Sequence, residues 1–226
     1  MTKPFDFDDP EHVRRYAEGP ARFIPGYATL HRLVIQLLTE RAGPDAHVLV
    51  LGAGGGLELH AFASAMPDWT FTGVDPSAPM LAQAKQHLGE AASRVSWTLG
   101  YIPDAPQGPF DAATCLLTLH MLEVPDKLPA LKAIRKRLKP SAPFAIVDHC
   151  FDNTAPDADK HLDRYARFAR DAGADPADVT RARAAIAAGK TMLSPEREEA
   201  LLHEAGFSNV ELFFAGLRWR GWIAQA

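Results

Sequence analysis

The residues best suited to chemistry stand in a glycine-rich stretch near position 50. The run VLVLGAGGGLEL, residues 48–59, places four glycines within five positions. Glycine has no Cβ, so Gly52, Gly54 and Gly56, with Ala53 between them, can let a ligand lie directly against the main chain. Because an apolar strand breaks into these glycines and then enters a helix, the ligand would meet the helix N-terminus. The alternative is a tight turn between strand and helix that binds nothing.

A carboxylate follows the last of these glycines by nineteen residues. Asp75 ends the next apolar run, FTGVDPS, which places it at the carboxyl end of a neighbouring strand. There its side chain can accept hydrogen bonds from both hydroxyls of a ribose. Pro76 and Met80 come next, and we expect both to contact the same ligand. Asp75 can also cap the helix that begins at Ala78, and the two roles do not exclude each other.

The glycine spacing distinguishes a dinucleotide site from an S-adenosylmethionine site, since both kinds of site would have this geometry. The dinucleotide fingerprint GxGxxG, counted from Gly52, requires a glycine at position 57, where this chain has Leu57. Gly56 instead completes the form GxGxG. We therefore predict S-adenosylmethionine as the cofactor.

The glycine loop and Asp75 must be positioned by the surrounding strands and helices, which the sequence indicates by short apolar runs alternating with helical patterns. We predict strands at 47–51, 70–74, 95–99, 111–116 and 143–148, with helices at about 57–66, 78–91 and 127–138. Two further strands, at about 209–214 and 217–224, form an antiparallel hairpin through Ala215 and Gly216. The predicted fold class is α/β, a doubly wound, Rossmann-like and mostly parallel sheet with this C-terminal hairpin.

The length of the chain predicts one domain, 1–226. Residues 1–43 are expected to form an N-terminal lid, with an amphipathic helix from 27 to 38, and 152–190 a helical insertion. Both segments would cover the substrate. Within the lid, Tyr16 and Arg22 either close over the substrate or lie on the surface.

Taken together, the motifs resemble the class I S-adenosylmethionine-dependent methyltransferases. The resemblance covers residues 47–150 and the final hairpin, and it rests on VLVLGAGGG, GVDPSAPML, FDAATCLLTLHML and LKAIRKRLKPSAPFAIVDH, in the order of that family. One position departs, since Val50 stands where the family commonly carries an acidic residue. After the third strand, Tyr101 replaces another acidic residue. Its ring could stack on adenine while Ile102 donates its N–H, or Tyr101 could simply cap the sheet edge.

The ends of the chain are similar to a narrower group, the carboxy-S-adenosylmethionine synthases of tRNA wobble-uridine modification. The similar segments are RFIPGYATLHRLVIQLL and LLHEAGFSNVELFFAGLRWRGWIA. This resemblance implies that Tyr27 and Leu116 contact the cofactor. The arginine that pairs with the extra carboxylate in that family falls at Leu201, and its asparagine of the fourth strand falls at Leu116. Because leucine cannot neutralise a carboxylate, ordinary S-adenosylmethionine is the predicted cofactor.

Two histidines are the candidate catalytic residues. His120 follows the fourth strand at the rim that would face the methyl group, where it could take a proton from a hydroxyl or an amine, or bond to the loop backbone. Asp148 and His149 end the fifth strand as a second candidate pair. No metal is predicted although Cys150 follows, because adjacent residues of a strand point to opposite faces.

The composition limits the partners. The chain has 24 Lys and Arg against 28 Asp and Glu, a net charge of −4, which argues against direct binding of nucleic acid. Two cysteines make no disulfide framework, and no apolar run is long enough for a membrane span, so a cytoplasmic protein without a membrane partner is predicted. Trp219 and Trp222 could supply a homodimer contact.

The predicted function is methyl transfer to a small-molecule acceptor. A carboxy-S-adenosylmethionine synthase and a non-catalytic S-adenosylmethionine-binding protein are the alternatives.

Overall fold

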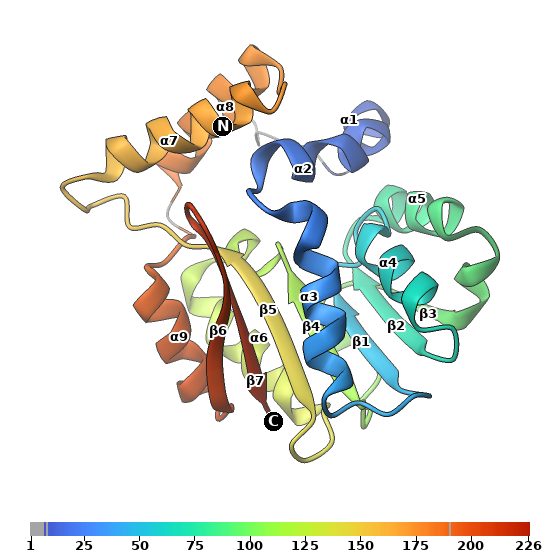
Figure 1. The fold of residues 1–226 in the computed structure, drawn as a ribbon. Coiled ribbons are helices and arrows are strands. Elements are labelled where there is room, and N and C mark those ends of the chain that lie inside the picture. The colour runs from blue at the N-terminus through green and yellow to red at the C-terminus, as the bar shows by residue number, and fades with distance from the viewer. Residues whose placement is uncertain (1–6, 8, 190) are drawn as a thin grey trace.

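The computed structural model describes residues 7, 9–189 and 191–226. Its centre is a seven-stranded sheet in the order β3-β2-β1-β4-β5-β7-β6 (Figure 1). The strands are β1 (His47–Leu51), β2 (Thr70–Asp75), β3 (Val95–Leu99), β4 (Ala112–Leu116), β5 (Pro143–His149), β6 (Ser208–Gly216) and β7 (Trp219–Gln225). The first five strands are parallel, and β7 runs antiparallel to both β5 and β6. The predicted α/β fold class, with its mostly parallel sheet and C-terminal hairpin, is confirmed.

The hairpin differs from the prediction in its turn. Ala215 and Gly216 still pair with Arg220 and Trp219, so the turn consists of Leu217 and Arg218 and not of Ala215 and Gly216. Leu217 takes the left-handed φ of 52° that the reversal requires. The second strand of the hairpin, β7, is the one that joins the parallel part of the sheet, since it pairs with β5 over its whole length.

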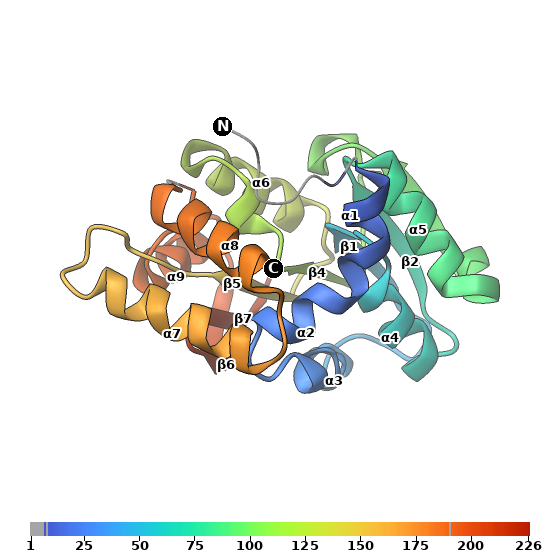
Figure 2. The ribbon, with the colours of Figure 1, turned by 90° about the horizontal axis from the view of Figure 1, so that it is seen from above.

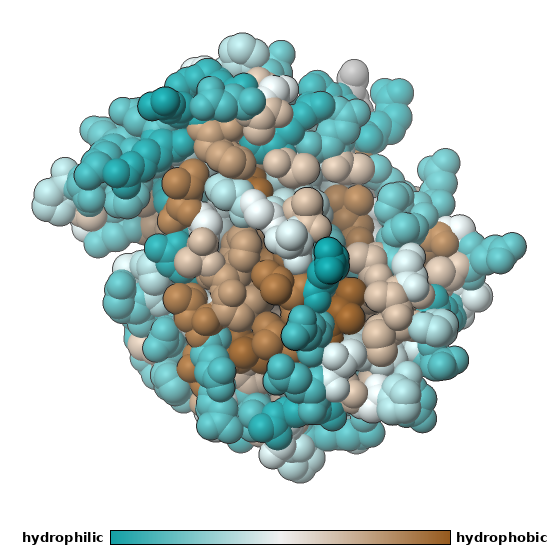
Figure 3. All heavy atoms as spheres, viewed as in Figure 1, coloured by the Kyte–Doolittle hydropathy of each residue, from teal (hydrophilic) through white to brown (hydrophobic). Residues whose placement is uncertain are grey.

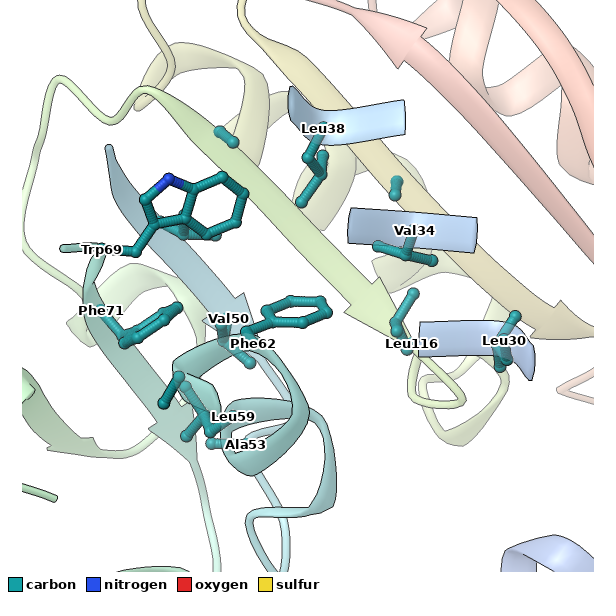
Figure 4. Packing of buried hydrophobic residues seen from close by; sticks show 14 of the residues in the cluster. Leu30, Val34, Leu38, Val50, Ala53, Leu59, Phe62, Trp69, Phe71 and Leu116 are labelled. Carbon is teal, nitrogen blue, oxygen red and sulfur yellow. The ribbon is translucent and has the colours of Figure 1, made fainter. Parts of the chain in front are cut away.

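Helices cover both faces of the sheet. On one face lie α3 (Tyr27–Thr39), α4 (Leu57–Ala65) and α5 (Ala78–Leu88), and on the other lie α6 (Val124–Lys136) and α9 (Pro195–Glu204). The α3 helix contributes Leu30, Val34 and Leu38 to the core at a spacing of four residues (Figure 4). This helix is therefore part of the packed core, so the predicted lid over residues 1–43 is shorter than expected.

Four helices lie over the carboxyl ends of the parallel strands (Figures 1 and 2). They are α1 (Pro10–Arg15), α2 (Gly19–Phe23), α7 (Ala158–Asp171) and α8 (Pro176–Ala188). The N-terminal pair contacts the insertion where the ring of Phe23 lies 5.8 Å from that of Tyr165. Any ligand at the strand ends is therefore bounded by both segments.

Apolar side chains gather on the face beside α3 where the helices leave part of the sheet uncovered (Figure 3). Phe213 and Ile223 of the hairpin are half-buried there. Trp219 and Trp222, by contrast, are only 6% and 1% exposed, so the expected dimer contact through these two tryptophans is wrong. The homodimer itself stays a prediction. Within the described part of the chain, every helix is too short or too polar to cross a bilayer.

Candidate cofactor and acceptor site

The glycine loop joins β1 to α4 through three residues with left-handed backbone angles. Gly52, Gly54 and Gly56 have φ values of 71°, 48° and 81°. A Cβ at Gly56 would come within 2.9 Å of the Ala84 backbone in α5, so this glycine is required for packing. At Gly54 the nearest atoms to an added Cβ lie at 3.5 Å or beyond, so it is the backbone angle that favours glycine there.

Asp75 braces this loop from the end of β2. The Gly54 N–H donates to Asp75 Oδ2 at 2.9 Å, and the Ser77 N–H donates to Oδ1 at the same distance. The helix α5 is capped by the Ser77 hydroxyl, which accepts from the Met80 N–H. The alternative in which Asp75 caps this helix is therefore wrong, and its carboxylate, 8% exposed, lies beside the glycines instead.

Several predicted cofactor-binding residues line one small cavity. Its volume is about 20 Å³, and its walls include Tyr27, Gly52, Ala53 and Leu116. Met80 lies next to it, with its methyl group 3.6 Å from the position of a Cβ at Gly54. The structure thus brings together residues from α3, the glycine loop, β4 and α5.

Three predicted residues lie farther along the rim. Tyr101 follows β3 with 59% of its surface exposed, and its N–H donates to Asp104 Oδ2 at 2.8 Å. Ile102 is buried against the core of the α6 face, and Pro76 is exposed. The exposed Tyr101 ring is accessible to a planar ligand, so its role against adenine stays a prediction.

Two side chains of this cavity were not predicted for it. Glu58, in the first turn of α4, is 7% exposed and lines the cavity. Tyr16 was expected either over the acceptor or on the surface, but its ring lies on the glycine loop, 2.9 Å from the position of a Cβ at Gly55. Arg22, the other candidate in the lid, pairs with Glu18 on the surface at 3.0 Å. No periodic pattern in the sequence predicts that Glu58 lies in this cavity, because its neighbours in space come from the distant segments β4 and α3.

The second part of the site is a histidine–carboxylate pair. His120 Nδ1 lies 2.6 Å from Asp148 Oδ1, and the His120 backbone N–H donates to the same oxygen at 2.9 Å. Burial alone would raise the pKa of Asp148, but the charges and hydrogen bonds of His120 and Lys127 lower it below its usual value. Asp148 is therefore ionised at neutral pH, and it fixes the orientation of the His120 ring.

A buried lysine supports Asp148 from the opposite side. Lys127 in α6 is fully buried, with its Nζ 3.4 Å from Asp148 Oδ2 and 2.5 Å from Glu198 Oε1. Burial, together with the charge of Asp148, raises the pKa of Glu198 to about 7. The four residues form one network that reaches from α9 to the rim of the sheet.

His149, the other candidate catalytic residue, belongs to an aromatic wall. Its ring stacks on Trp219 at 4.3 Å and lies 5.5 Å from Tyr165 and 5.9 Å from His120. Burial and the neighbouring Arg218 and His120 lower its pKa well below the usual value, so the ring is neutral at pH 7. Asp148 thus contacts His120, whereas His149, its neighbour in β5, points to the opposite face of the sheet.

Arg218 is a further buried charge that the sequence did not indicate. Its guanidinium group lies 3.3 Å above the ring of Phe151, and its Nε and Nη1 atoms have no acceptor among the described residues. Burial lowers its pKa to about 10. The charge of Arg218 acts to lower the pKa values of both Tyr165 and His149, so the three residues lie close together beneath the helices of the insertion.

Other features of the described chain lie outside this site. A larger hollow of about 450 Å³ lies between α9 and the hairpin and is lined by Glu199, His203, Arg220 and Trp222. It has no contact with the glycine loop. Among the residues that the structure describes, no group of three or more His, Cys, Asp or Glu side chains could hold a metal ion.

Comparison with known proteins shows which fold this chain shares. Residues 49–144 match the family model described as a methyltransferase domain. The structure of human N-acetylserotonin methyltransferase, determined with S-adenosylmethionine, aligns with a TM-score of 0.64 at 16% identity, over 97% of this chain and 57% of that one. The chain has the class I methyltransferase fold. The fold that the resemblance predicted from the sequence is thereby confirmed.

Two further similarities concern chains of comparable length. A carboxy-S-adenosyl-L-methionine synthase of Chromohalobacter salexigens is 26% identical over 97% of this chain and 83% of its own. An S-adenosylmethionine-dependent methyltransferase structure from Aquifex aeolicus aligns with a TM-score of 0.62 at 18% identity, over 96% of this chain and 98% of that one. The class I fold therefore extends over nearly the whole chain.

Proposed function

We propose that this protein transfers a methyl group from S-adenosylmethionine to a small-molecule acceptor that carries a hydroxyl or an amine. The observation that supports methyl transfer best is the contact between His120 and Asp148 at the ends of β4 and β5. His120 is a base held in one orientation by the buried carboxylate of Asp148. It can take the proton from the hydroxyl or amine of the acceptor as that group attacks the methyl carbon.

The glycine loop fits the proposed cofactor. Gly54 and Gly55 carry no side chain, and the side chain nearest to the position of a Cβ at Gly55 is that of Tyr16. Asp75 holds the loop through the Gly54 N–H and lies where ribose hydroxyls would be bound. We expect a cofactor on these glycines to displace the Tyr16 ring, which would move the segment between α1 and α2.

When bound, S-adenosylmethionine supplies an activated methyl group on its sulfonium. The chain then needs to align the acceptor, exclude water and receive a proton. The stacked rings of His149 and Trp219, with Tyr165 beside them, provide a flat apolar wall next to His120. A planar acceptor would fit against these rings, and α7, which carries Tyr165, would limit the access of water.

The first test is calorimetric titration of the purified protein with S-adenosylmethionine and S-adenosylhomocysteine. We expect both to bind, and a panel of planar phenols and aryl amines should then include compounds that cause release of S-adenosylhomocysteine. Absence of binding would refute the cofactor assignment. Binding without turnover on any acceptor would favour the non-catalytic alternative.

A carboxy-S-adenosylmethionine synthase is the second candidate. The similarity to the Chromohalobacter salexigens enzyme over nearly the whole chain favours it, as do Nε and Nη1 of the buried Arg218, which have no acceptor among the described residues. Leu201 argues against it, since it stands where the sequence resemblance puts the arginine and is buried in the apolar core. The nearby Lys127 is already paired with two carboxylates. Mass analysis of the cofactor carried through purification decides, because the extra carboxylate adds mass.

A further inference from the structure

Glu58 is a buried carboxylate that neither the fold nor methyl transfer as described above accounts for. Its side chain is more than nine-tenths buried, and Oε1 has no hydrogen-bond partner among the described residues. A buried polar atom left without a partner destabilises the folded state, and an ionised one does so more strongly. A protein can keep a buried carboxyl group of this kind, despite the loss of stability, when a bound ligand supplies the missing hydrogen-bond partner.

The cavity beside Glu58 suits a positive ligand group. Of the described residues that line it, Glu58 is the only carboxylate, and the others include no lysine or arginine. His31 also lines the cavity, but burial lowers its pKa to about 4, so that it is neutral at pH 7. Tyr16 and Tyr27 contribute hydroxyl groups and ring faces. The cavity therefore offers one carboxyl group to a cationic ligand group, and its described lining residues include no competing cation.

Glu58 also lies near the position at which the sequence departs from its family. Val50 replaces the acidic residue that is common two positions before the first glycine, and it is fully buried in β1. Thr114 is the register partner of Val50 in β4. The Thr114 hydroxyl is close enough to Glu58 to oppose part of the rise in pKa, to about 8, that burial causes. The carboxylate from α4 thus approaches the strands beside residue 50.

We propose that Glu58 binds the ammonium group at the amino-acid end of the cofactor, in place of the acidic residue missing at Val50. This inference rests on the proposed function, because it assigns a residue to one end of the same ligand. The geometry that supports it is a buried carboxylate oxygen without a partner in a cavity bounded by the glycine loop, α3 and the end of β4.

The proposal predicts a particular selectivity among ligands. S-adenosylhomocysteine carries the ammonium group, whereas its des-amino analogue differs only by lacking it. Hydrogen bonds between charged groups contribute enough for a difference of about 10- to 100-fold in affinity. We expect wild-type protein to bind S-adenosylhomocysteine more tightly than the analogue by that factor.

Isothermal titration calorimetry of both ligands against wild type, Glu58→Gln and the surface control Glu40→Gln tests the assignment. Glu58→Gln should weaken binding of S-adenosylhomocysteine by about 10- to 100-fold and leave the analogue within about twofold, while Glu40→Gln should change neither. If Glu58→Gln weakens both ligands equally, or neither, the inference is overturned. If the wild type binds neither ligand, the proposed function fails first.

The comparison of the two ligands on wild-type protein needs no variant, so it holds even where Glu58→Gln does not fold. Equal affinity of wild type for the two ligands would overturn the proposal. Titration in two buffers of different ionisation enthalpy gives a second readout. We expect wild type to release more protons than Glu58→Gln on binding at pH 7, since the buried carboxylate must ionise to meet the cation.

Discussion

Replacing Lys127 by Met tests whether the buried network holds the site together. At an effective dielectric constant of 20, the attraction of Nζ for Glu198 at 2.5 Å is about 7 kcal/mol and for Asp148 at 3.4 Å about 5 kcal/mol. Burial of the ammonium group offsets much of this attraction. We expect Lys127→Met to lower the free energy of unfolding by about 3–5 kcal/mol, because the two carboxylates stay buried without their cation.

The assay is urea unfolding followed by tryptophan fluorescence, for which the chain has four tryptophans. Lys132→Met, at an exposed site of the same helix, is the matched control and should change the free energy of unfolding by about 0.5 kcal/mol or less. The double variant Lys127→Met with Glu198→Gln should recover part of the loss, because it removes one of the unpaired charges. A loss below about 1 kcal/mol for Lys127→Met would refute the reasoning.

The pH dependence of the same loss has a defined sign. Without Lys127, the folded-state pKa values of Asp148 and Glu198 should rise, and Glu198 starts from about 7. A carboxyl group with a raised pKa in the folded state stabilises that state at low pH and loses this contribution as pH rises. The difference between wild type and variant should therefore shrink as the pH falls from 8 to 5. A difference that grows towards acid would contradict the assigned network.

Three further changes probe the cofactor and acceptor sides separately. Asp75→Asn should weaken S-adenosylhomocysteine binding about tenfold or more in calorimetry, since the neutral side chain supports the Gly54 N–H and a ribose less well. Gly56→Ala should lower the free energy of unfolding by at least about 1–2 kcal/mol in urea, because its left-handed backbone and the Ala84 contact both oppose a Cβ; unchanged stability would contradict this. His120→Asn should reduce turnover about 10²- to 10⁴-fold without changing cofactor affinity, and unaltered turnover would remove the base assignment.

The glycine loop and the strand ends were predictable because their signals are local. An apolar run that ends in glycines defines both β1 and the turn after it, and the structure has this strand at the predicted residues 47–51. Asp75 likewise ends its strand, so its place on the rim follows from the topology alone. Local pattern also indicated that Asp148 and His149 face opposite ways, which the structure bears out.

The pairings across the site were not predictable in the same way. His120 and Asp148 are 28 positions apart, and the sequence placed both on one rim without indicating that they contact each other. Glu58 looks like an ordinary acidic residue of a helix first turn, favourable to the helix dipole wherever it points. Only the packing of α4 against β4 and α3 turns it inward. Arg218 was missed because the turn of the hairpin was placed two residues too early.

The position of β7 between β5 and β6 has a consequence for synthesis on the ribosome. β6 contacts the sheet only through β7, so it cannot join until the later strand has been made. Until then β5 presents an unpaired edge, which can recruit strands from other chains. Trp219, which stacks on His149, arrives with β7. A growing chain can therefore form the glycine loop early, whereas the acceptor wall is completed last and the nascent sheet stays prone to aggregation until that moment.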